Sequence, residues 1–398
     1  MSTLKVDNIR HNSATSDAIT MASDGTCTAK LTSVGGGQLS HRNLIINGAM
    51  NVAQRGVTGT GYGYIAVDRF RTGASQVDEN PTTEQVDVAS GTTPYTNGFT
   101  KAIKITNGNQ TGGAGTGDAM NFTYRLEAQD IRNSGWNYLS SSSYITLSFW
   151  CKSSVAQTFY GRLYTSDGTA YNYPFSMGSL SADTWTKVTK TIPGNSNLTF
   201  DNNENQGLAI EFAMFNGTAK TDSGVSLDTW AAYNTATRMP DFTSTWYTTN
   251  DSTWELTGVQ LEVGDTATSF EHISYGEELR RCERYFQCLK GPSLVDTGDN
   301  EACYGIAFAY TSSRTLWSFI FKTEMRDHPT MTMNTIANLQ GLGVVGGWNA
   351  ATQLNYANKS SKLGCRVDLN WSGTPYTAGH AVEMRIVSDG LLSFDAEL

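Results

Sequence analysis

The sequence predicts a mainly β protein with an N-terminal attachment arm, a jelly-roll-like β-sandwich, one connecting α-helix and a C-terminal β-sandwich. Short runs of alternating apolar and polar residues, separated by turn residues, occupy most of the chain. Glycine is abundant (39 residues) and proline scarce (8), as in proteins with many tight turns. Charged residues make up 16% of the chain, below the ~25% of ordinary soluble proteins.

Composition excludes several classes of function. The net charge of −9 argues against a nucleic-acid partner, which would require clustered Lys and Arg. No apolar run approaches the ~20 residues of a membrane span, so we expect no membrane insertion. The opening MSTLKVDNIR has no apolar core of a secretory signal, and the six scattered cysteines are typical of free thiols made in a reducing cytosol. The five histidines are far apart, so we expect no metal and no cofactor.

Residues 1–42 are predicted to form an arm and a glycine linker. Within them, residues 1–34 contain too little apolar surface to fold alone and need a partner chain or an attachment surface. Gly35 to Gly37 then provide a flexible joint.

Residues 43–272 are predicted to form one large sandwich. NLIINGAM is expected to be a strand that ends in an Asn-Gly turn, and in YITLSFWCKSS the residues Ile145, Leu147 and Phe149 share one face. YGRLYTSDGTAYNY predicts a hairpin with a two-residue loop at Asp167 and Gly168. FTKAIKIT, WTKVTKTIPG, GLAIEFAMFNG and STWELTGVQLEVG supply further strands. Strands of this regularity indicate a two-sheet sandwich.

The helix is predicted over residues 273–291. Ser274 can act as its N-cap with Glu277 three positions later, and Gly291-Pro292 would stop it. An apolar stripe with steps of four and three residues makes it the candidate for trimerisation, through Tyr275, Leu279, Cys282, Phe286 and Leu289. The stripe must be buried either against the flanking β-domains or against copies of itself. Residues 292–398 are expected to form the second β-domain.

Several segments resemble those of bacteriophage tail fibres and related receptor-binding virion proteins. NLIINGAMNVAQRG with YIAVDRFR is similar to the opening of their central domain. ITLSFWCKS, WTKVTKTIPG and WELTGVQLEVGDTATSFE resemble its carbohydrate-binding-module-like sandwich, and SYGEELRRCERYFQ resembles the helix that follows. TLKVDNI and AITMASDG look like the attachment arms. The resemblance implies a homotrimeric virion protein on the phage tail, which attaches to tail proteins through residues 1–34 and binds host cell-surface polysaccharide. We expect the protein to be assembled in the host cytoplasm and not to be an enzyme.

Aromatic residues on predicted loops are the candidates for glycan binding, because sugar rings pack their C–H faces on Tyr or Trp while neighbouring polar groups bind hydroxyls. The long polar and aromatic segment 228–251 is expected to be an elaborate loop. The candidates are Trp230, Tyr233, Trp246, Tyr247, Trp136, Tyr138, Tyr62 and Tyr64, with Trp348, Tyr356, Trp371 and Tyr376 in the C-terminal domain. Each ring could instead be core packing.

Three alternatives remain open. The protein could be a structural virion decoration or collar protein without a glycan site. It could be a polysaccharide depolymerase, with paired carboxylates drawn from Asp118, Glu127 and Asp130 or from Asp222, Asp228 and Asp241. The oxygen-rich loop Asp201 to Asn205 could bind calcium.

The glycine motif GLGVVG (341–346) lacks the βαβ context of a dinucleotide site and is predicted to be a turn.

Overall fold

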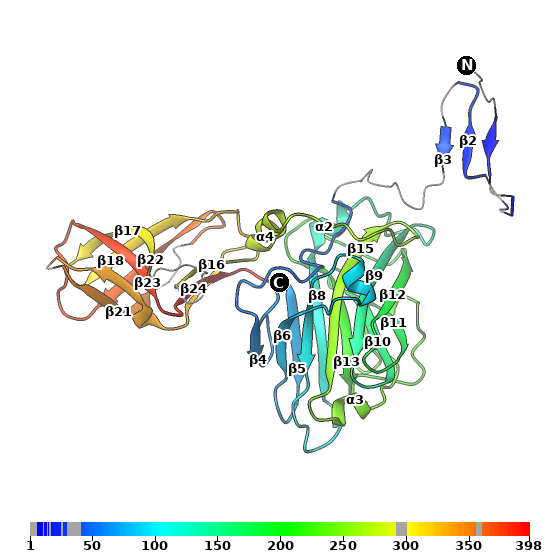
Figure 1. The fold of residues 1–398 in the computed structure, drawn as a ribbon, viewed down its shortest axis with the longest axis horizontal. Coiled ribbons are helices and arrows are strands. Elements are labelled where there is room, and N and C mark those ends of the chain that lie inside the picture. Colours follow the sequence, from blue (N-terminus) through cyan, green and yellow to red (C-terminus); the bar gives the residue numbers. More distant parts are fainter. Residues whose placement is uncertain are drawn as a thin grey trace.

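The chain is mainly β, as predicted (Figure 1). The computed structural model describes residues 6–10, 12–13, 15, 17–24, 27–29, 41–291, 301–344, 346–355 and 360–398. Within residues 6–29, β1 (Asn8–Ile9), β2 (Ile19–Met21) and β3 (Cys27–Ala29) pair in an antiparallel sheet. Much of the predicted attachment arm lies outside the described residues, and its attachment role stays a prediction.

The central part of the chain is a β-sandwich of two antiparallel sheets. The first sheet has the order β14-β11-β10-β13-β8-β5. Its strands are β5 (Phe70–Ser75), β8 (Ala119–Glu127), β10 (Gln157–Thr165), β11 (Tyr171–Leu180), β13 (Gln206–Asn216) and β14 (Ala231–Ala232). The second sheet has the order β12-β9-β15-β7-β6-β4. Its strands are β4 (Thr58–Thr60), β6 (Thr82–Asp87), β7 (Lys101–Thr106), β9 (Tyr144–Ser153), β12 (Thr186–Pro193) and β15 (Thr253–Val263).

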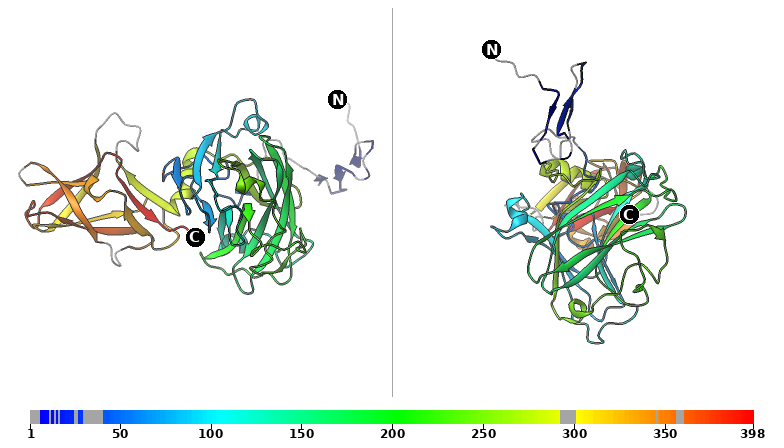
Figure 2. Two further views of the ribbon diagram at one scale, coloured as in Figure 1. Left: turned by 90° about the horizontal axis from the view of Figure 1, so that it is seen from below. Right: turned by 90° about the vertical axis from the view of Figure 1, so that its right-hand side faces the viewer.

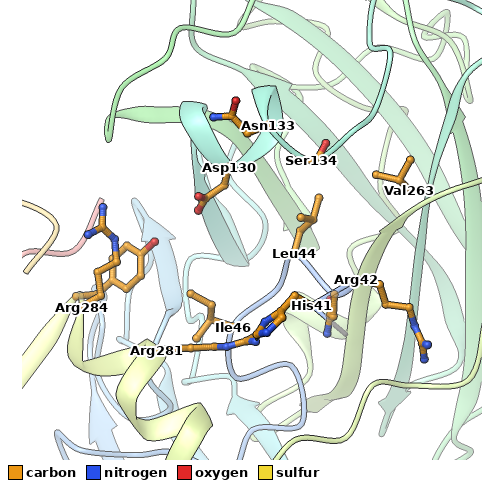
Figure 3. A pocket seen from close by; sticks show the side chains of 12 residues that line it. His41, Arg42, Leu44, Ile46, Asp130, Asn133, Ser134, Val263, Arg281 and Arg284 are labelled. Atoms are coloured by element: carbon orange, nitrogen blue, oxygen red, sulfur yellow. The ribbon is translucent and has the colours of Figure 1, made fainter. Parts of the chain in front are cut away.

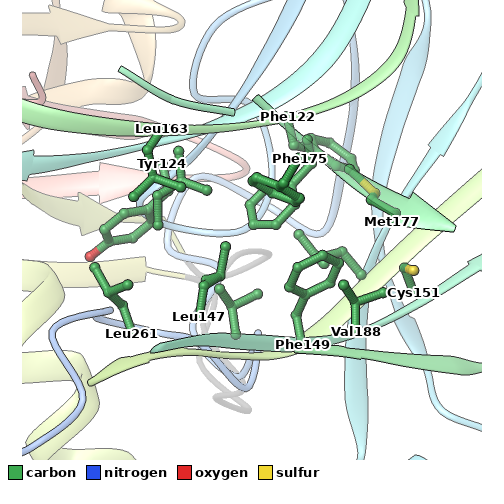
Figure 4. Close-up of a cluster of buried hydrophobic side chains, with 14 of the residues drawn as sticks. Phe122, Tyr124, Leu147, Phe149, Cys151, Leu163, Phe175, Met177, Val188 and Leu261 are labelled. Atoms are coloured by element: carbon green, nitrogen blue, oxygen red, sulfur yellow. The ribbon is translucent and has the colours of Figure 1, made fainter. Parts of the chain in front are cut away.

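The core lies between these two sheets (Figure 4). Ile145, Leu147 and Phe149 of β9 are fully buried on one face, as their alternation predicts. The Phe149 ring meets Phe212 of the facing sheet edge to face, with 4.9 Å between centroids. Interdigitation of two inner faces in this way is the usual core of a β-sandwich.

Short helices cover the ends and edges of the sandwich. They are α1 (Thr93–Thr96), α2 (Ala128–Arg132) and α3 (Thr245–Thr248). Two local predictions need correction. The segment 43–46 is not a strand; it enters the core as an irregular segment anchored by the buried Asn43, whose side-chain oxygen accepts the N–H groups of Ile45 and Leu261 at 3.0 Å. The hairpin loop at Gly168 is also wider than two residues, because pairing of β10 with β11 stops at Tyr164 and Asn172.

The connecting helix is shorter than predicted. The helix α4 spans Tyr275–Glu283, with the Ser274 hydroxyl accepting from the Glu277 N–H at 3.3 Å as its N-cap. Residues Phe286–Lys290 form a strand, β16, instead of the last helical turns. They pair with β24 (Leu391–Asp395), and this pairing overrides the helical pattern of the segment.

The C-terminal part is a closed barrel rather than the expected sandwich. Its strand order is β17-β18-β22-β21-β20-β23, and β17 pairs with both β18 and β23 to close it. The strands are β17 (Glu301–Thr311), β18 (Arg314–Ile320), β20 (Leu339–Leu342), β21 (Trp348–Asn355), β22 (Gly364–Trp371) and β23 (Ala381–Val387), with the 3-10 turn η2 (Ile336–Asn338) before β20. Strand alternation is the same in a sandwich and a barrel, so the sequence pattern did not separate them.

A small sheet in the order β16-β24-β19, with β19 at Thr330–Met333, joins the barrel to the sandwich (Figure 2). Among the described residues, no helix is long and apolar enough to cross a membrane. In the same part of the chain, Cys151, Cys282, Cys288, Cys303 and Cys365 are free thiols.

Candidate functional site

Half of the predicted glycan-binding aromatics of the sandwich are core residues. Trp230, Trp246, Tyr247 and Trp136 are at most 8% exposed, so the prediction that they present rings to a ligand is wrong. Each has a partner inside the protein. The indole nitrogen of Trp230 donates to the Pro193 carbonyl at 2.7 Å, and that of Trp246 donates to the Thr253 carbonyl at 3.0 Å. The polar loop 228–251 therefore uses its tryptophans to fasten itself to the sandwich.

The remaining sandwich candidates are scattered rather than gathered. Tyr62 is exposed, and Tyr138 is half-buried against Phe200. Tyr64 is half-buried beside Arg55, whose guanidinium lies 5.5 Å from its ring centre, and burial raises the pKa of the Tyr64 hydroxyl to about 12. In the barrel, Trp371 and Tyr376 are buried and Trp348 is covered by Arg385; Tyr356 lies outside the described residues.

Tyr233 belongs to a polar and aromatic cluster on the outer face of the first sheet. Its ring packs edge to face on Tyr164, with 4.8 Å between centroids, and Arg162 lies within 5.5 Å of both rings. Glu211 fixes Arg162 through contacts of 2.9 and 2.7 Å. A cleft of about 390 Å³, lined by Asn172, Pro174, Asp222, Gly224, Val225, Ser226, Thr229, Ala231, Ala232 and Thr237, adjoins this cluster. No aromatic ring lines that cleft, which limits its use for sugar stacking.

The outer face of the second sheet carries a better-formed site, here called the aromatic cleft. It has a volume of about 410 Å³ and is lined by Asn97, Phe99, Ser148, Trp150, Lys187, Gly258, Ala267, Thr268, Ser269, Phe270 and His272. Cross-strand pairing places Trp150 of β9 between Lys187 of β12 and Thr257 of β15. Ser148 lies two residues before Trp150, on the same face of the strand.

One wall of the aromatic cleft is a cluster of rings. Phe99 and Phe270 meet edge to face at 4.9 Å, and the His272 ring lies 4.8 Å from Phe270. The His272 Nε2 atom is 3.1 Å from the carbonyl of Asn97, which holds the imidazole at the rim. Gly258 makes this wall possible, because it has φ of +63° and a Cβ there would lie 2.7 Å from the Phe99 ring.

Two polar groups of the aromatic cleft are available to a ligand. In the part of the chain that the structure describes, no hydrogen bond or ion pair engages the Lys187 ammonium or the Trp150 indole nitrogen. Trp150 is half-buried and Lys187 is exposed. The cleft therefore offers an aromatic face together with charged and neutral hydrogen-bond donors, the combination that binds saccharides.

Sequence reasoning missed Trp150, although a signal for it was present. Ile145, Leu147 and Phe149 alternate toward the core, so Trp150 must point to the opposite face of β9. A tryptophan on the outward face of a sandwich strand, beside the outward Ser148, is a candidate ligand contact.

A further cleft, here called the junction cleft, lies where the start of the sandwich meets α2 and α4 (Figure 3). Its volume is about 650 Å³, and it is lined by His41, Arg42, Asn43, Leu44, Ile46, Asp130, Asn133, Ser134, Val263, Arg281, Arg284 and Tyr285. Figure 3 shows Arg281 of α4 pointing toward His41, and the two side chains are hydrogen-bonded. Asp130, Asn133 and Ser134 lie across the cleft from them.

Two carboxyl groups near the junction cleft have oppositely shifted pKa values. Burial would raise the pKa of Glu127, but hydrogen bonds from Arg284, at 2.8 Å to each oxygen, and from Tyr285, at 2.6 Å, outweigh it and lower that pKa. Burial and the Glu127 charge raise the pKa of Asp130 to about 6. Such pairs serve acid–base catalysis elsewhere. Here protein donors occupy both oxygens of the fully buried Glu127, which leaves it no role as a nucleophile or base.

The part of the chain that the structure describes contains no group of three or more His, Cys, Asp or Glu residues that could hold a metal ion. The residues of the loop Asp201 to Asn205 instead bond one another and their neighbours, as in the contact from the Asp201 N–H to the Asp167 carboxylate at 3.0 Å.

Comparison with solved structures finds phage and carbohydrate-binding proteins of low similarity. The enzymatically active domain of tailspike protein 4 of bacteriophage CBA120 has a TM-score of 0.28 and 11% identity, covering 56% of this chain and 22% of that chain. A structure of CBM4 has a TM-score of 0.27 and 14% identity, covering 55% and 98%. The CBM22-1–CBM22-2 tandem domain of Paenibacillus barcinonensis Xyn10C has a TM-score of 0.24 and 8% identity, covering 87% and 98%.

This chain thus spans about a fifth of the length of the tailspike chain. No protein-family model matches the chain, and no curated protein matches it either. The TM-scores all lie below 0.3, and a likeness this low says nothing about function.

Proposed function

We propose that this protein binds polysaccharide through the aromatic cleft on the outer face of the second sheet. One observation carries the proposal: the half-buried Trp150 lines a cleft of about 410 Å³ together with Ser148, Lys187 and His272. A sugar ring stacked on the indole would place its hydroxyls near the Lys187 ammonium. Stacking of this kind contributes on the order of 1 kcal/mol beyond the area it buries.

The setting that we propose is the tail of a bacteriophage. The resemblance of the arm, the sandwich segments and the helix to tail fibres supports a virion protein that binds the host surface during adsorption. We propose binding without catalysis, because Glu127 is saturated by protein donors. A structural decoration protein without a glycan site is the alternative. The Lys187 ammonium and the Trp150 indole nitrogen argue against it, because no hydrogen bond or ion pair engages either group in the described part of the chain.

We also propose that the protein forms a trimer. Of the five predicted trimer contacts, Cys282 and Phe286 are buried within their own chain and are not available. Tyr275, Leu279 and Leu289 line a cleft of about 270 Å³ beside Tyr304, and Tyr275 is 59% exposed. We propose that these three residues contact other copies in a trimer, in which weak sugar sites would act together.

The binding proposal is tested by Trp150→Ala, measured on a glycan array and on whole host cells. We expect binding to fall at least about tenfold, the loss for roughly 1.4 kcal/mol of stacking and burial. Trp185→Ala is the matched control, because Trp185 is a half-buried tryptophan just before the neighbouring strand β12 and does not line the cleft. Equal binding by both variants and the wild type would exclude the aromatic cleft as the site.

A further inference from the structure

Besides the Lys187 ammonium and the Trp150 indole nitrogen, the imidazole of His272 offers a polar atom to the aromatic cleft. Its Nε2 atom lies 3.1 Å from the Asn97 carbonyl, which can only accept a hydrogen bond. The proton of the neutral imidazole is therefore on Nε2, and Nδ1 carries a lone pair. Among the described residues, none forms a hydrogen bond with Nδ1, and His272 is exposed at the rim of the cleft.

The neighbours of the imidazole hold it in one orientation. The Asn97 carbonyl, at the C-terminal end of α1, fixes Nε2. Gly98 has φ of +91°, and a Cβ there would lie 3.1 Å from both Cε1 and Nε2, so the backbone packs against that edge of the ring. Phe99 and Phe270 contact the ring, with 5.2 and 4.8 Å between centroids. An acceptor that is already oriented binds a ligand without the cost of ordering it.

Lys187 and His272 have opposite hydrogen-bonding roles in this cleft. Lys187 lies directly across from Trp150 in the pairing of β12 with β9, and its ammonium can only donate. The Nδ1 atom of a neutral imidazole can only accept. A free sugar hydroxyl both donates and accepts, so a ring stacked on Trp150 satisfies both groups through its hydroxyls. An acylated hydroxyl or an anionic oxygen has no proton to donate, and it would leave the imidazole unpaired.

We propose that His272 determines the specificity of the aromatic cleft, by accepting a hydrogen bond at Nδ1 from a free hydroxyl of the sugar stacked on Trp150. This inference rests on the proposed function and adds the class of ligand. The bound sugar carries an unsubstituted hydroxyl beside the imidazole, rather than an O-acetyl, sulfate or carboxylate group at that position. The loss of one neutral hydrogen bond corresponds to a fall in affinity of about threefold to tenfold.

The test uses methyl glycosides of glucose, galactose, mannose and rhamnose, with derivatives in which fluorine replaces one hydroxyl at a time and so removes its proton. Ligand-observed NMR titration of the full chain, at about pH 8 where an ordinary histidine is neutral, measures the dissociation constants. For the wild type, one fluorine position should weaken binding about threefold to tenfold by removing the donor to Nδ1. In His272→Phe, which keeps a ring beside Phe99 and Phe270, that fluorine should have no effect, and the parent sugar should bind about threefold to tenfold more weakly than it binds the wild type.

His380→Phe is the matched control, because His380 is an exposed histidine next to β23 and does not line the cleft. It should bind every sugar as the wild type does, and a thermal melt shows that both variants are folded. The inference fails if no fluorine position weakens binding to the wild type, or if His272→Phe keeps the affinity and every fluorine effect of the wild type. The proposed site itself fails if no sugar of the panel binds, or if Trp150→Ala leaves the binding of the parent sugar intact, so the two failures are distinguishable.

Discussion

Gly258 shows how a single residue shapes the proposed site. It lies at the β-bulge where pairing of β15 with β9 shifts register between Thr257 and Gln260, and its φ of +63° is unfavourable for any side chain. The bulge turns this part of β15 toward the Phe99 ring, which then forms a wall of the aromatic cleft with Phe270. The conformation of one glycine thus sets the position of the ring cluster.

Gly258→Ala should lower the free energy of unfolding by more than about 1 kcal/mol, through backbone strain and displacement of Phe99. Urea unfolding measures the loss, and saccharide affinity should fall with it. Gly276→Ala is the matched control: Gly276 lies in α4, has no positive φ, and a Cβ there meets nothing within 4 Å. Because Ala is the better helix former, that variant should be neutral or slightly more stable. If the Gly258→Ala protein is as stable as this control, Gly258 does not set the position of the Phe99 ring.

The helix α4 combines a correct local prediction with an incorrect length. The Ser274 cap forms as its spacing predicts. Glu277 also contacts Arg281, four residues later in the helix, at 3.4 Å. The helix nevertheless ends at Glu283, because the next residues find stronger partners. Tyr285 is buried with its hydroxyl on Glu127, and Phe286 pairs with Asp395 of β24. The apolar stripe predicted for one helix is consequently divided between the helix α4 and the strand β16.

The trimer that we propose would use Tyr275 and Leu279 of the shortened helix. Replacing both with Ser should convert a trimer to monomers in sedimentation velocity, because the contact loses its apolar surface. Leu139→Ser is the control, since Leu139 is a half-exposed leucine of the sandwich that does not line the cleft of Tyr275 and Leu279. A trimer that survives the double replacement would place the interface elsewhere, and a monomeric wild type would remove the prediction.

The sandwich and the barrel are joined by ionic contacts around the segment 395–397. Arg55 of the sandwich contacts Asp395 at 3.0 Å and Glu397 at 3.4 Å, and Arg69 pairs with Glu397. The Arg69 guanidinium also lies over the Tyr285 ring, 3.4 Å from its centre, and the Arg55 guanidinium lies over the Phe286 ring, 3.7 Å from its centre. Buried ion pairs of this kind add little net stability, because the cost of desolvating the charges offsets their attraction.

Arg326 fastens the other side of the same joint. It donates to the carbonyls of Ala396 at 2.7 Å and of Glu204 in the sandwich at 3.1 Å. Arg326→Ala leaves these acceptors unpaired, so we expect a loss of roughly 1–3 kcal/mol. Calorimetry should then show the sandwich and the barrel melting separately. Lys101→Ala, which removes an exposed ion pair with Asp87, should leave the melting profile unchanged. One undivided transition in Arg326→Ala would show that other contacts couple the two parts.

The sequence by itself determined the fold class, most strand positions and the start of α4, because alternation and capping are local properties of the chain. It also contained the outward position of Trp150, in the alternation of Ile145, Leu147 and Phe149. Tertiary structure decided which aromatic residues face water. Trp246 looked like a loop residue and is buried because the loop folds back onto the sandwich.

Tertiary structure also decided the closure of the barrel, the end of α4 and the assembly of both clefts. Each depends on contacts between distant residues, such as Phe286 with Asp395, Phe99 with Phe270, and Arg281 with His41. Alternation and spacing report only the neighbours of a residue along the chain. The pairing that brings Lys187 beside Trp150 follows from the order of strands in the sheet, which the local pattern does not encode.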